Sequence, residues 1–507
     1  MPIATPTTTT STAGPDTGQK YGAALATVTT LFFMWGFLTC LNDILVPHLK
    51  SIFDLNYAGI MLVQFAFFGS YFLFSIPSAK LIDLIGYQRS MVVGLLTMGV
   101  GAFLFVPAAS VPSYPLFLGA LIVLAAGITC LQVAANPYVT VLGKPETASS
   151  RLNLTQAFNS LGTFLAPFFG GLFILTAARK IEEIRALAPA DLQAYRLHEA
   201  ATVKMPYLGL GIALVLLAIA IGSFKLPKIE HAQHQLGEKV NDSVWKHPNL
   251  VFGAIAIFVY VGAEVSIGSF LVNYFNQPEI GGLAEKVAAA FVAFYWGGAM
   301  LGRFIGSNFL AGAKAKYMSL VTVGTIALIL LSYPIQRTLP PGYQPGVPNL
   351  TFLAWLVVAG RPLFMLVATA TAAIAIVAAL RGGQAKANTG ILLGVCAIST
   401  SVLVAISMFS SGHLALWSII LVGFFNSIMF PSIFTLGVAE LGPLTGDGSG
   451  ILIMAIVGGA IIPVTQGWIA DQIGIHHAFF LPVVCYLYIL FFALSGSKPN
   501  SERYAKA

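Results

Sequence analysis

The chain has 507 residues, of which 57% are hydrophobic and only 9% are charged, and its formal net charge is +7. A soluble protein carries about 25% charged residues, so this composition excludes a soluble globular fold and predicts an integral membrane protein. The positive charge does not indicate nucleic-acid binding, because the lysines and arginines form no basic run and lie mostly in short loops that orient membrane helices.

The chain is long enough for many membrane helices, each of which needs about 20 apolar residues. Residues 1–21 predict a disordered tail, because they are polar, of low complexity and without the basic-then-apolar order of a signal peptide. Charge-free stretches, divided at Gly-, Pro- and Ser-rich breaks, then predict about fourteen helices. We expect them at 22–47, 57–84, 90–108, 114–142, 151–176, 205–225, 250–275, 286–311, 317–335, 350–380, 388–409, 414–438, 449–471 and 476–496.

The distribution of lysine and arginine predicts the orientation of these helices. An even number of helices places both termini on one side, and the segments on that side hold roughly twice as many lysines and arginines as the opposite segments. Most of the opposing charges lie in one long loop, 177–204, and long loops count for less. We therefore expect a multi-pass protein of the cell (inner) membrane with both termini in the cytoplasm.

One helix pattern occurs twice in the sequence. Residues 131–143 read LQVAANPYVTVLG and residues 425–437 read FNSIMFPSIFTLG, so each has an amide, then a proline, then a glycine at the same spacing. Because proline interrupts the hydrogen bonding of a helix, we expect a broken helix in both places. The matched positions are Gln132, Pro137 and Gly143 against Asn426, Pro431 and Gly437, followed by Gly162, Pro167 and Gly171 against Gly458, Pro463 and Gly467.

The spacing of the repeat reveals an insertion. Gln132 and Asn426 are 294 residues apart, whereas the earlier match of Phe67 with Tyr295 spans 228 residues, so the second copy gains 66 residues between these points. The gain corresponds to two helices, for which 317–380 is the natural candidate. Repeats of the same orientation are related by an axis along the membrane normal, as in major facilitator transporters.

The expected architecture is therefore an all-α polytopic membrane protein with a major facilitator fold, in which two six-helix halves are supplemented by the inserted pair. The segments are a tail at 1–21, a first half at 22–226, a cytoplasmic linker at 227–249, a second half at 250–496 and a cytoplasmic tail at 497–507.

The loop between the second and third helices supports this fold. In AKLIDLIGYQR, Asp83, Gly86 and Arg89 have the spacing of the superfamily motif GxxxDxxGxRR, with Ala79 in place of the first glycine. This motif controls how the halves close, so we interpret these residues as a gating loop and not as a substrate site.

Two carboxylates interrupt apolar spans. Asp43 lies four residues before Pro47, in a helix that continues apolar to Val46, and Glu264 lies in the middle of its own helix. An ionisable side chain is costly in hydrocarbon, so both are candidate functional residues. The alternatives are an interfacial carboxylate for Asp43 and a structural ion pair for Glu264.

Amides form the second candidate group. Gln132 and Asn136 share one helix face, Gln156 and Asn159 share another, and Asn426 repeats Gln132 in the second half. An amide offers both a donor and an acceptor, which suits a polyhydroxylated ligand bound between the halves.

Aromatic and basic side chains near these positions allow weaker interpretations. Tyr295, Trp296 and Trp468 can stack on a pyranose ring or can instead contact lipid. Arg303 can pair with a buried acid, whereas Arg361, next to Pro362, can extend to the membrane surface.

Several segments carry a resemblance to a known family. LNDILVP, ANPYVTVLG, RLNLTQAFNSLG and FNSIMFPSIFTLG resemble the fucose–proton symporter family of the major facilitator superfamily, and YVGAEVSIGSFLVNYF is similar to its glucose/galactose transporter branch. The resemblance covers about 22–316 and 388–496, and the insertion departs from the usual twelve-helix pattern.

The resemblance implies a function and places it on residues. It implies uptake of a monosaccharide such as glucose, galactose or mannose, driven by a cation gradient through alternating access. The coupling carboxylate of the family's first helix falls on Asp43, the glutamate of its fourth helix falls on Gln132, and its sugar-contacting amides fall on Gln156 and Asn159. We expect a transporter and not an enzyme, acting as a monomer in the lipid bilayer without cofactor or nucleic acid.

The replacement of the second acid affects the expected ion. Gln132 cannot titrate, so a proton relay through that pair is broken, and we expect Na⁺ in preference to H⁺. Asp43, Asn42 and Gln132 supply the oxygen ligands that a hard cation prefers. Glu264 is the rival, because it can replace the lost acid and restore proton coupling.

Other functions stay open at this point. A proton-coupled fucose or N-acetylglucosamine symporter and an uncoupled sugar facilitator both fit the fold. A multidrug exporter favours a more apolar pocket, and a membrane glycosyltransferase needs acidic residues on a large extramembrane loop.

Overall fold

The computed structural model describes residues 21–53, 57–111, 113–173, 187–227, 243–283, 285–338 and 352–499. Within these ranges the side chains of residues 41–52, 57–61, 64, 167–173, 285–286, 289, 338 and 352–353 are not described. The first half consists of α1 (Gly22–Phe53), α2 (Tyr57–Ile85), α3 (Tyr87–Ser110), α4 (Tyr114–Val141), α5 (Ala148–Phe173), α7 (Pro189–Thr202) and α8 (Lys204–Ser223). The second half begins with α9 (Pro248–Phe275), α10 (Glu285–Gly312), α11 (Ala315–Thr338), α12 (Phe352–Ala359) and α13 (Arg361–Leu380). It continues with α14 (Thr389–Phe409), α15 (Gly412–Asn426), α16 (Met429–Gly437), α17 (Thr445–Met454), α18 (Gly458–Ile473), α19 (Ile475–Ala478) and α20 (Phe480–Phe491).

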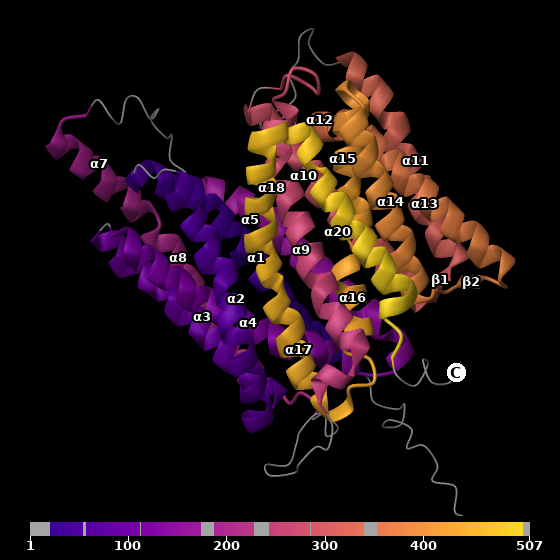
Figure 1. Ribbon diagram of the computed structural model, residues 1–507, viewed down its shortest axis with the longest axis horizontal. Helices are drawn as coiled ribbons and strands as arrows, with labels where there is room; N and C mark the ends of the chain where they lie inside the picture. The colour runs from indigo at the N-terminus through magenta and orange to yellow at the C-terminus, as the bar shows by residue number, and fades with distance from the viewer. Residues whose placement is uncertain are drawn as a thin grey trace, which may run out of the picture.

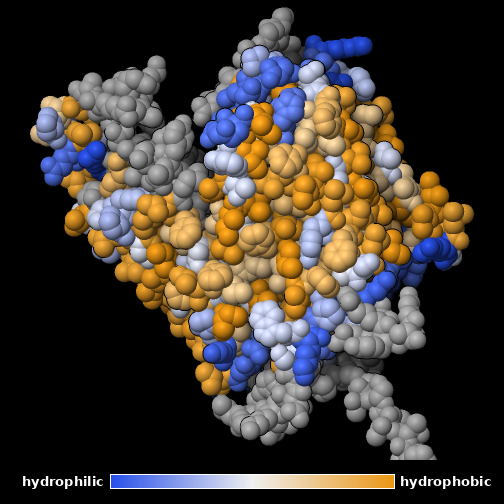
Figure 2. Space-filling model, viewed as in Figure 1, coloured by the Kyte–Doolittle hydropathy of each residue, from blue (hydrophilic) through white to orange (hydrophobic). Residues whose placement is uncertain are grey.

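The helices have the length and composition of membrane spans. Within the described residues, 12 helical segments are long and apolar enough to cross a bilayer. Figure 2 shows hydrophobic side chains over the middle of one face, with hydrophilic side chains gathered toward its two ends. These observations confirm an all-helical polytopic membrane protein. The expected fourteen spans are not all found by this criterion, since helices α5 and α10 lie outside the set.

Five elements differ from the sequence expectation. The single helices expected at 449–471 and 476–496 are each divided, into α17 and α18 and into α19 and α20. Residues 189–202 form helix α7 within what was expected to be a loop, and Pro189 occupies its first turn. The single span expected at 350–380 is divided into α12 and α13 at Gly360, and Pro362 lies in the first turn of α13. The helix expected at 414–438 is divided into α15 and α16 at Ser427 and Ile428.

The repeat predicted from glycine spacing has a physical counterpart in helix packing. A Cβ atom on Gly162 of α5 would lie 2.3 Å from the carbonyl oxygen of Phe33 in α1. A Cβ atom on the matched Gly458 of α18 would lie 2.0 Å from the carbonyl oxygen of Phe258 in α9. In both halves, therefore, a glycine lets the backbones of two helices approach more closely than any side chain would permit.

The segment expected as an insertion packs largely on itself. Helices α11 and α13 contact each other, and α13 also contacts α10. In Figure 1, α11 and α13 lie at the outer edge of the molecule. The segment is closed at its base by an antiparallel ladder between β1 (Ala313–Lys314) and β2 (Gln384–Ala385), in which Ala313 pairs with Ala385. The residues that precede and follow the segment therefore lie side by side.

The two halves contact each other near the end of the bundle that carries the α2–α3, α4–α5 and α16–α17 connections. Ser150 of α5 and Ser307 of α10 exchange hydrogen bonds with each other's carbonyl oxygen, at 2.7 and 3.1 Å. A Cβ atom on Gly450 of α17 would lie 2.8 Å from the Cβ atom of Ala79 in α2. The halves are thus tightly packed at this end.

Candidate functional site

The repeated amides each bond to a tyrosine within their own half. In the first half, Gln132 Nε2 on α4 donates to the hydroxyl of Tyr71 on α2 at 2.9 Å. In the second half, Asn426 Nδ2 on α15 donates to Tyr295 on α10 at 3.1 Å and to Tyr486 on α20 at 2.9 Å. Both amides are buried, so the bonds to tyrosine take the place of the hydrogen bonds to water that burial removes. The sequence predicted the amides but missed Tyr71 and Tyr486, since nothing in an apolar run marks one tyrosine as an amide partner.

The two prolines behave differently from each other. The expected break is wrong for α4, which runs through Pro137, whereas the second helix is interrupted just before Pro431. A proline removes the donor for the carbonyl four residues earlier. For Pro137 that carbonyl belongs to Val133, and it accepts a hydrogen bond from Ser449 Oγ of the opposite half at 2.9 Å. α4 therefore tolerates its proline because another helix supplies the missing donor.

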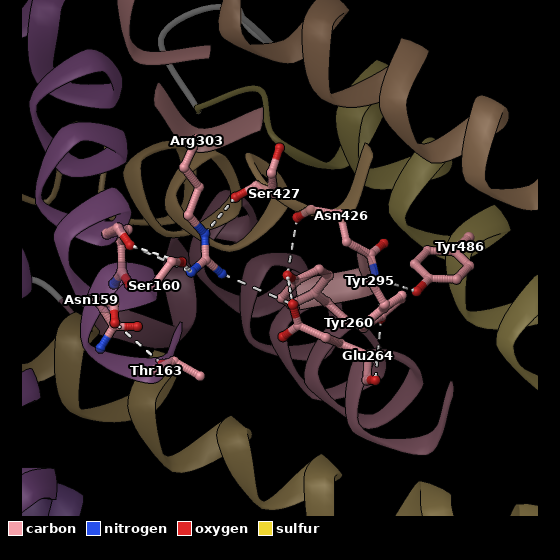
Figure 3. A network of polar contacts seen from close by, with 11 residues as sticks. Asn159, Ser160, Thr163, Tyr260, Glu264, Tyr295, Arg303, Asn426, Ser427 and Tyr486 are labelled. Atoms are coloured by element: carbon pink, nitrogen blue, oxygen red, sulfur yellow. Dashed lines mark hydrogen bonds and ion pairs between the residues drawn. The ribbon is translucent and has the colours of Figure 1, made fainter. Parts of the chain in front are cut away.

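The carbonyl freed by Pro431 belongs to Ser427, and it accepts from Arg303 Nε at 3.0 Å. Arg303 lies on α10, and its guanidinium also donates to Ser160 Oγ and to the carbonyl of Gln156 on α5, the latter at 3.4 Å. One side chain thus joins the broken helix of the second half to α5 of the first (Figure 3). The sequence missed Ser160, although it follows Gln156 by four residues on the same helix face.

Glu264 has both a cation and a hydroxyl beside it. Its Oε1 lies 4.0 Å from Arg303 Nη2 and accepts a hydrogen bond from Tyr260 at 2.7 Å. The side chains of Arg303 and Glu264 are only 11% and 13% exposed. The prediction that Arg303 pairs with a buried acid is therefore confirmed, and Tyr260 is a further member whose position four residues before Glu264 was the available signal.

The amides of α4 and α5 have distinct surroundings. Asn159 Nδ2 donates to the carbonyl of Phe32 on α1 at 3.0 Å, so this hydrogen bond joins α5 to α1. Gln156 is buried one turn away. Asn136 is fully buried, and neither polar atom of its amide has a hydrogen-bond partner among the described residues. A buried amide without hydrogen-bond partners requires an explanation, such as a bound ligand or a second conformation of the protein that supplies the partners.

The remaining predicted residues are placed as follows. Trp296 lies against Tyr295 with ring centroids 5.0 Å apart, whereas Trp468 is 67% exposed on α18 and so favours the lipid-contact interpretation. Arg361 lies over the ring of Tyr333, 5.0 Å from its centroid, within the inserted segment. The side chains of Asp43 and Asn42 lie outside the described part of the chain.

Asp83 of the gating-loop motif lies at the contact between the halves. Gly86 immediately precedes α3 and has a φ of 81°, a conformation that glycine adopts without strain. Asp83 Oδ1 lies 3.4 Å from where a Cβ atom of Gly446 would be, in the first turn of α17. A carboxylate at a helix N-terminus is stabilised by the partial positive charge there.

Comparison with known proteins now identifies the family. Residues 24–390 match the sequence profile of the Major Facilitator Superfamily. The chain belongs to the Major Facilitator Superfamily. It is therefore a membrane transporter and not an enzyme, as the sequence predicted.

Individual relatives within the superfamily confirm the predicted resemblance. The chain is 46% identical over 480 residues to a protein of Brucella abortus named glucose/galactose transporter, with 95% of each chain covered. It is 31% identical over 493 residues to the L-fucose-proton symporter of Escherichia coli, with 94% of each covered. The crystal structure of FucP in the outward conformation superposes with a TM-score of 0.73 at 28% identity, covering 95% of this chain and 100% of that one. These names give no support to the expected sodium coupling, since the ion they mention is the proton.

Proposed function

We propose that this major facilitator transporter imports a monosaccharide, with glucose, galactose or mannose as the leading candidates, by cation-coupled alternating access. The observation that carries the proposal is the set of amides and hydroxyls on or beside α4, α5 and α15, of which α4 packs against α17 and α5 against α10 of the opposite half. Gln132, Asn136, Gln156, Asn159 and Asn426 all lie on these helices, with the hydroxyls of Tyr71 and Tyr295 beside them. Paired donors and acceptors are what a ligand with several hydroxyl groups requires.

We further propose H⁺ as the driving cation, ahead of the Na⁺ that the sequence favoured. Two relatives are named proton symporters. Glu264 also provides a second carboxylate besides Asp43, on the opposite half from the glutamate that Gln132 replaces. An L-fucose symporter is the second candidate, favoured by the likeness to FucP.

The proposed architecture has fourteen membrane helices in the cell (inner) membrane, with α5 and α10 added to the twelve apolar segments and both termini in the cytoplasm. Helices α5 and α10 contact α1 and α9, which are the first helices of their halves. The proposed inserted pair is α11 with α12–α13, since this segment packs chiefly on itself.

Counterflow in proteoliposomes tests this proposal. Vesicles loaded with one unlabelled sugar at a time are diluted into the labelled sugar, with and without Na⁺ and with and without a pH gradient. We expect exchange of at least one hexose, and accumulation that follows the pH gradient in Na⁺-free buffer. Absence of exchange for every sugar of the panel would reject the transport of monosaccharides, whereas accumulation that requires Na⁺ would restore the sodium expectation.

A further inference from the structure

The guanidinium of Arg303 bonds to both halves at once. It donates to Ser427 in its own half, to Ser160 and Gln156 on α5 of the first half, and it lies 4.0 Å from the carboxylate of Glu264. In Figure 3 the guanidinium lies between Ser160 of α5 on one side and Glu264 on the other. Arg303, Glu264 and the tyrosines beside Glu264 are called the Glu264 cluster. The α5 residues that it touches are one turn or less from Asn159, so Arg303 lies against the proposed sugar-binding helix.

The charge balance of this cluster depends on one proton. Among the described residues, Tyr260 of α9 donates to the carboxylate of Glu264, Arg303 of α10 lies 4.0 Å from it, and Tyr295 of α10 donates to the carbonyl of Glu264. Tyr486 of α20 is joined to Tyr295 through the amide of Asn426. Tyrosine hydroxyls are neutral and arginine is charged at physiological pH. A proton on Glu264 therefore changes the cluster from a neutral ion pair to an uncompensated guanidinium.

We propose that Glu264 is a proton-binding site of the transport cycle and that Arg303 transmits its charge state to α5. The inference rests on the proposed sugar transport and adds the residues that couple the sugar to the proton. When Glu264 is ionised, the guanidinium is neutralised within the second half and its bonds to α5 can be given up. When Glu264 takes a proton from the external solution, the cation loses its counter-charge and depends on the oxygens of Ser160 and Gln156.

This arrangement explains why a proton would not cross alone. A protonated carrier without sugar is held closed, because separating α5 from α10 would leave a buried guanidinium with neither a counter-charge nor its oxygen partners on α5, and that is costly. A sugar bound to α5 supplies hydroxyl oxygens to the guanidinium and so replaces the contacts that must break. The loaded carrier and the empty, ionised carrier can then both change conformation, and the proton leaves Glu264 on the cytoplasmic side.

The substitution Glu264→Gln imitates the protonated carboxyl group and cannot release a proton. In Glu264→Gln we expect counterflow to continue at a reduced rate, accumulation under a pH gradient to fall to the level of de-energised vesicles, and sugar-induced proton uptake to disappear. The matched control is Glu279→Gln, which removes an exposed carboxylate just beyond the end of α9 and should accumulate sugar as the unmodified protein does. Gradient-driven accumulation by Glu264→Gln would overturn the proposal, even while wild-type counterflow confirms sugar transport.

A second measurement does not depend on that variant. Arg303→Gln removes the cation that holds the sugar-free protonated carrier closed, so a pyranine-loaded vesicle should lose its pH gradient several-fold faster than with the wild type, in the absence of sugar. A leak equal to that of the wild type would overturn the role of Arg303. Asp43→Asn distinguishes the two acids: loss of accumulation there, combined with full accumulation in Glu264→Gln, would assign the proton to Asp43 alone.

Discussion

The contact between Gly450 and Ala79 allows a test of how the halves close. A methyl group added at Gly450 would lie 2.8 Å from the Cβ atom of Ala79 and 3.3 Å from the carbonyl oxygen of Ser75. Carbon atoms prefer a separation of about 3.5–4.0 Å, so α2 and α17 would have to move apart by roughly 1 Å. Overpacking of this kind costs about 1–3 kcal/mol, which shifts a two-state equilibrium by about 5–150-fold. Because the clash exists only where the halves meet, Gly450→Ala should favour the conformation that is open at this end.

Cross-linking of cysteines placed at Ser150 and Ser307 measures closure at the same end. In a background without the four native cysteines, Gly450→Ala should lower the rate of cross-linking by a short thiol reagent. Ala79→Gly removes the facing methyl group, so the double variant should recover most of the parental rate. Gly324→Ala is the matched control, because a Cβ atom there meets nothing within 4 Å. The reasoning is refuted if Gly450→Ala cross-links as fast as the parent, or if Ala79→Gly gives no recovery.

Three further predictions concern binding, stability and the inserted segment. Asn159→Ala should weaken sugar binding by about tenfold or more in an equilibrium binding assay, because a sugar hydroxyl left without its hydrogen-bond partner costs about 1–3 kcal/mol. Unchanged affinity in both Asn159→Ala and Gln156→Ala would show that α5 does not form part of the site. Asn249→Ala should lower the free energy of unfolding of the detergent-solubilised protein by about 1–3 kcal/mol, because Asn249 Nδ2 donates to three carbonyls at the end of α16, at 3.0–3.2 Å. Asn308→Ala loses one hydrogen bond within its own helix and should have a smaller effect in the same thermal-unfolding assay. Removal of residues 315–383, with a short joining loop, should preserve sugar counterflow, because the β1–β2 ladder already brings the flanking residues together. Loss of counterflow in a variant that elutes as a folded, monodisperse protein would place the segment in the transport core.

The sequence predicts the polar residues of the centre better than it predicts their partners. Gln132, Asn426 and Glu264 could be identified because each is costly in an apolar helix. Their partners could not be identified, because they lie far away in the sequence. Asn426 bonds to the hydroxyl of Tyr295, 131 residues away, and to that of Tyr486, 60 residues away. The continuity of α4 at Pro137 was unpredictable for the same reason, because the donor from Ser449 is 316 residues away.

The sequence predicts the matched glycines of the two halves but does not predict helix α7. The close glycine contacts at Gly162 and Gly458 follow from the repeat, which is visible in the sequence. Helix α7 was missed, because its mixed polar composition has no transmembrane signal, although Pro189 marks its first turn.

The carbonyl of Val133 has a consequence for the energetics of transport. Pro137 leaves it without a donor in its own helix, and the hydroxyl that satisfies it, Ser449 Oγ, belongs to the other half. When the halves separate at this end, the carbonyl must find a replacement, and water is the available donor. The matching carbonyl of Ser427 is satisfied by Arg303 within its own half and needs no such exchange. Hydration of the first half therefore accompanies opening, so the rate of conformational exchange should depend on water activity and should fall in concentrated excluded osmolytes.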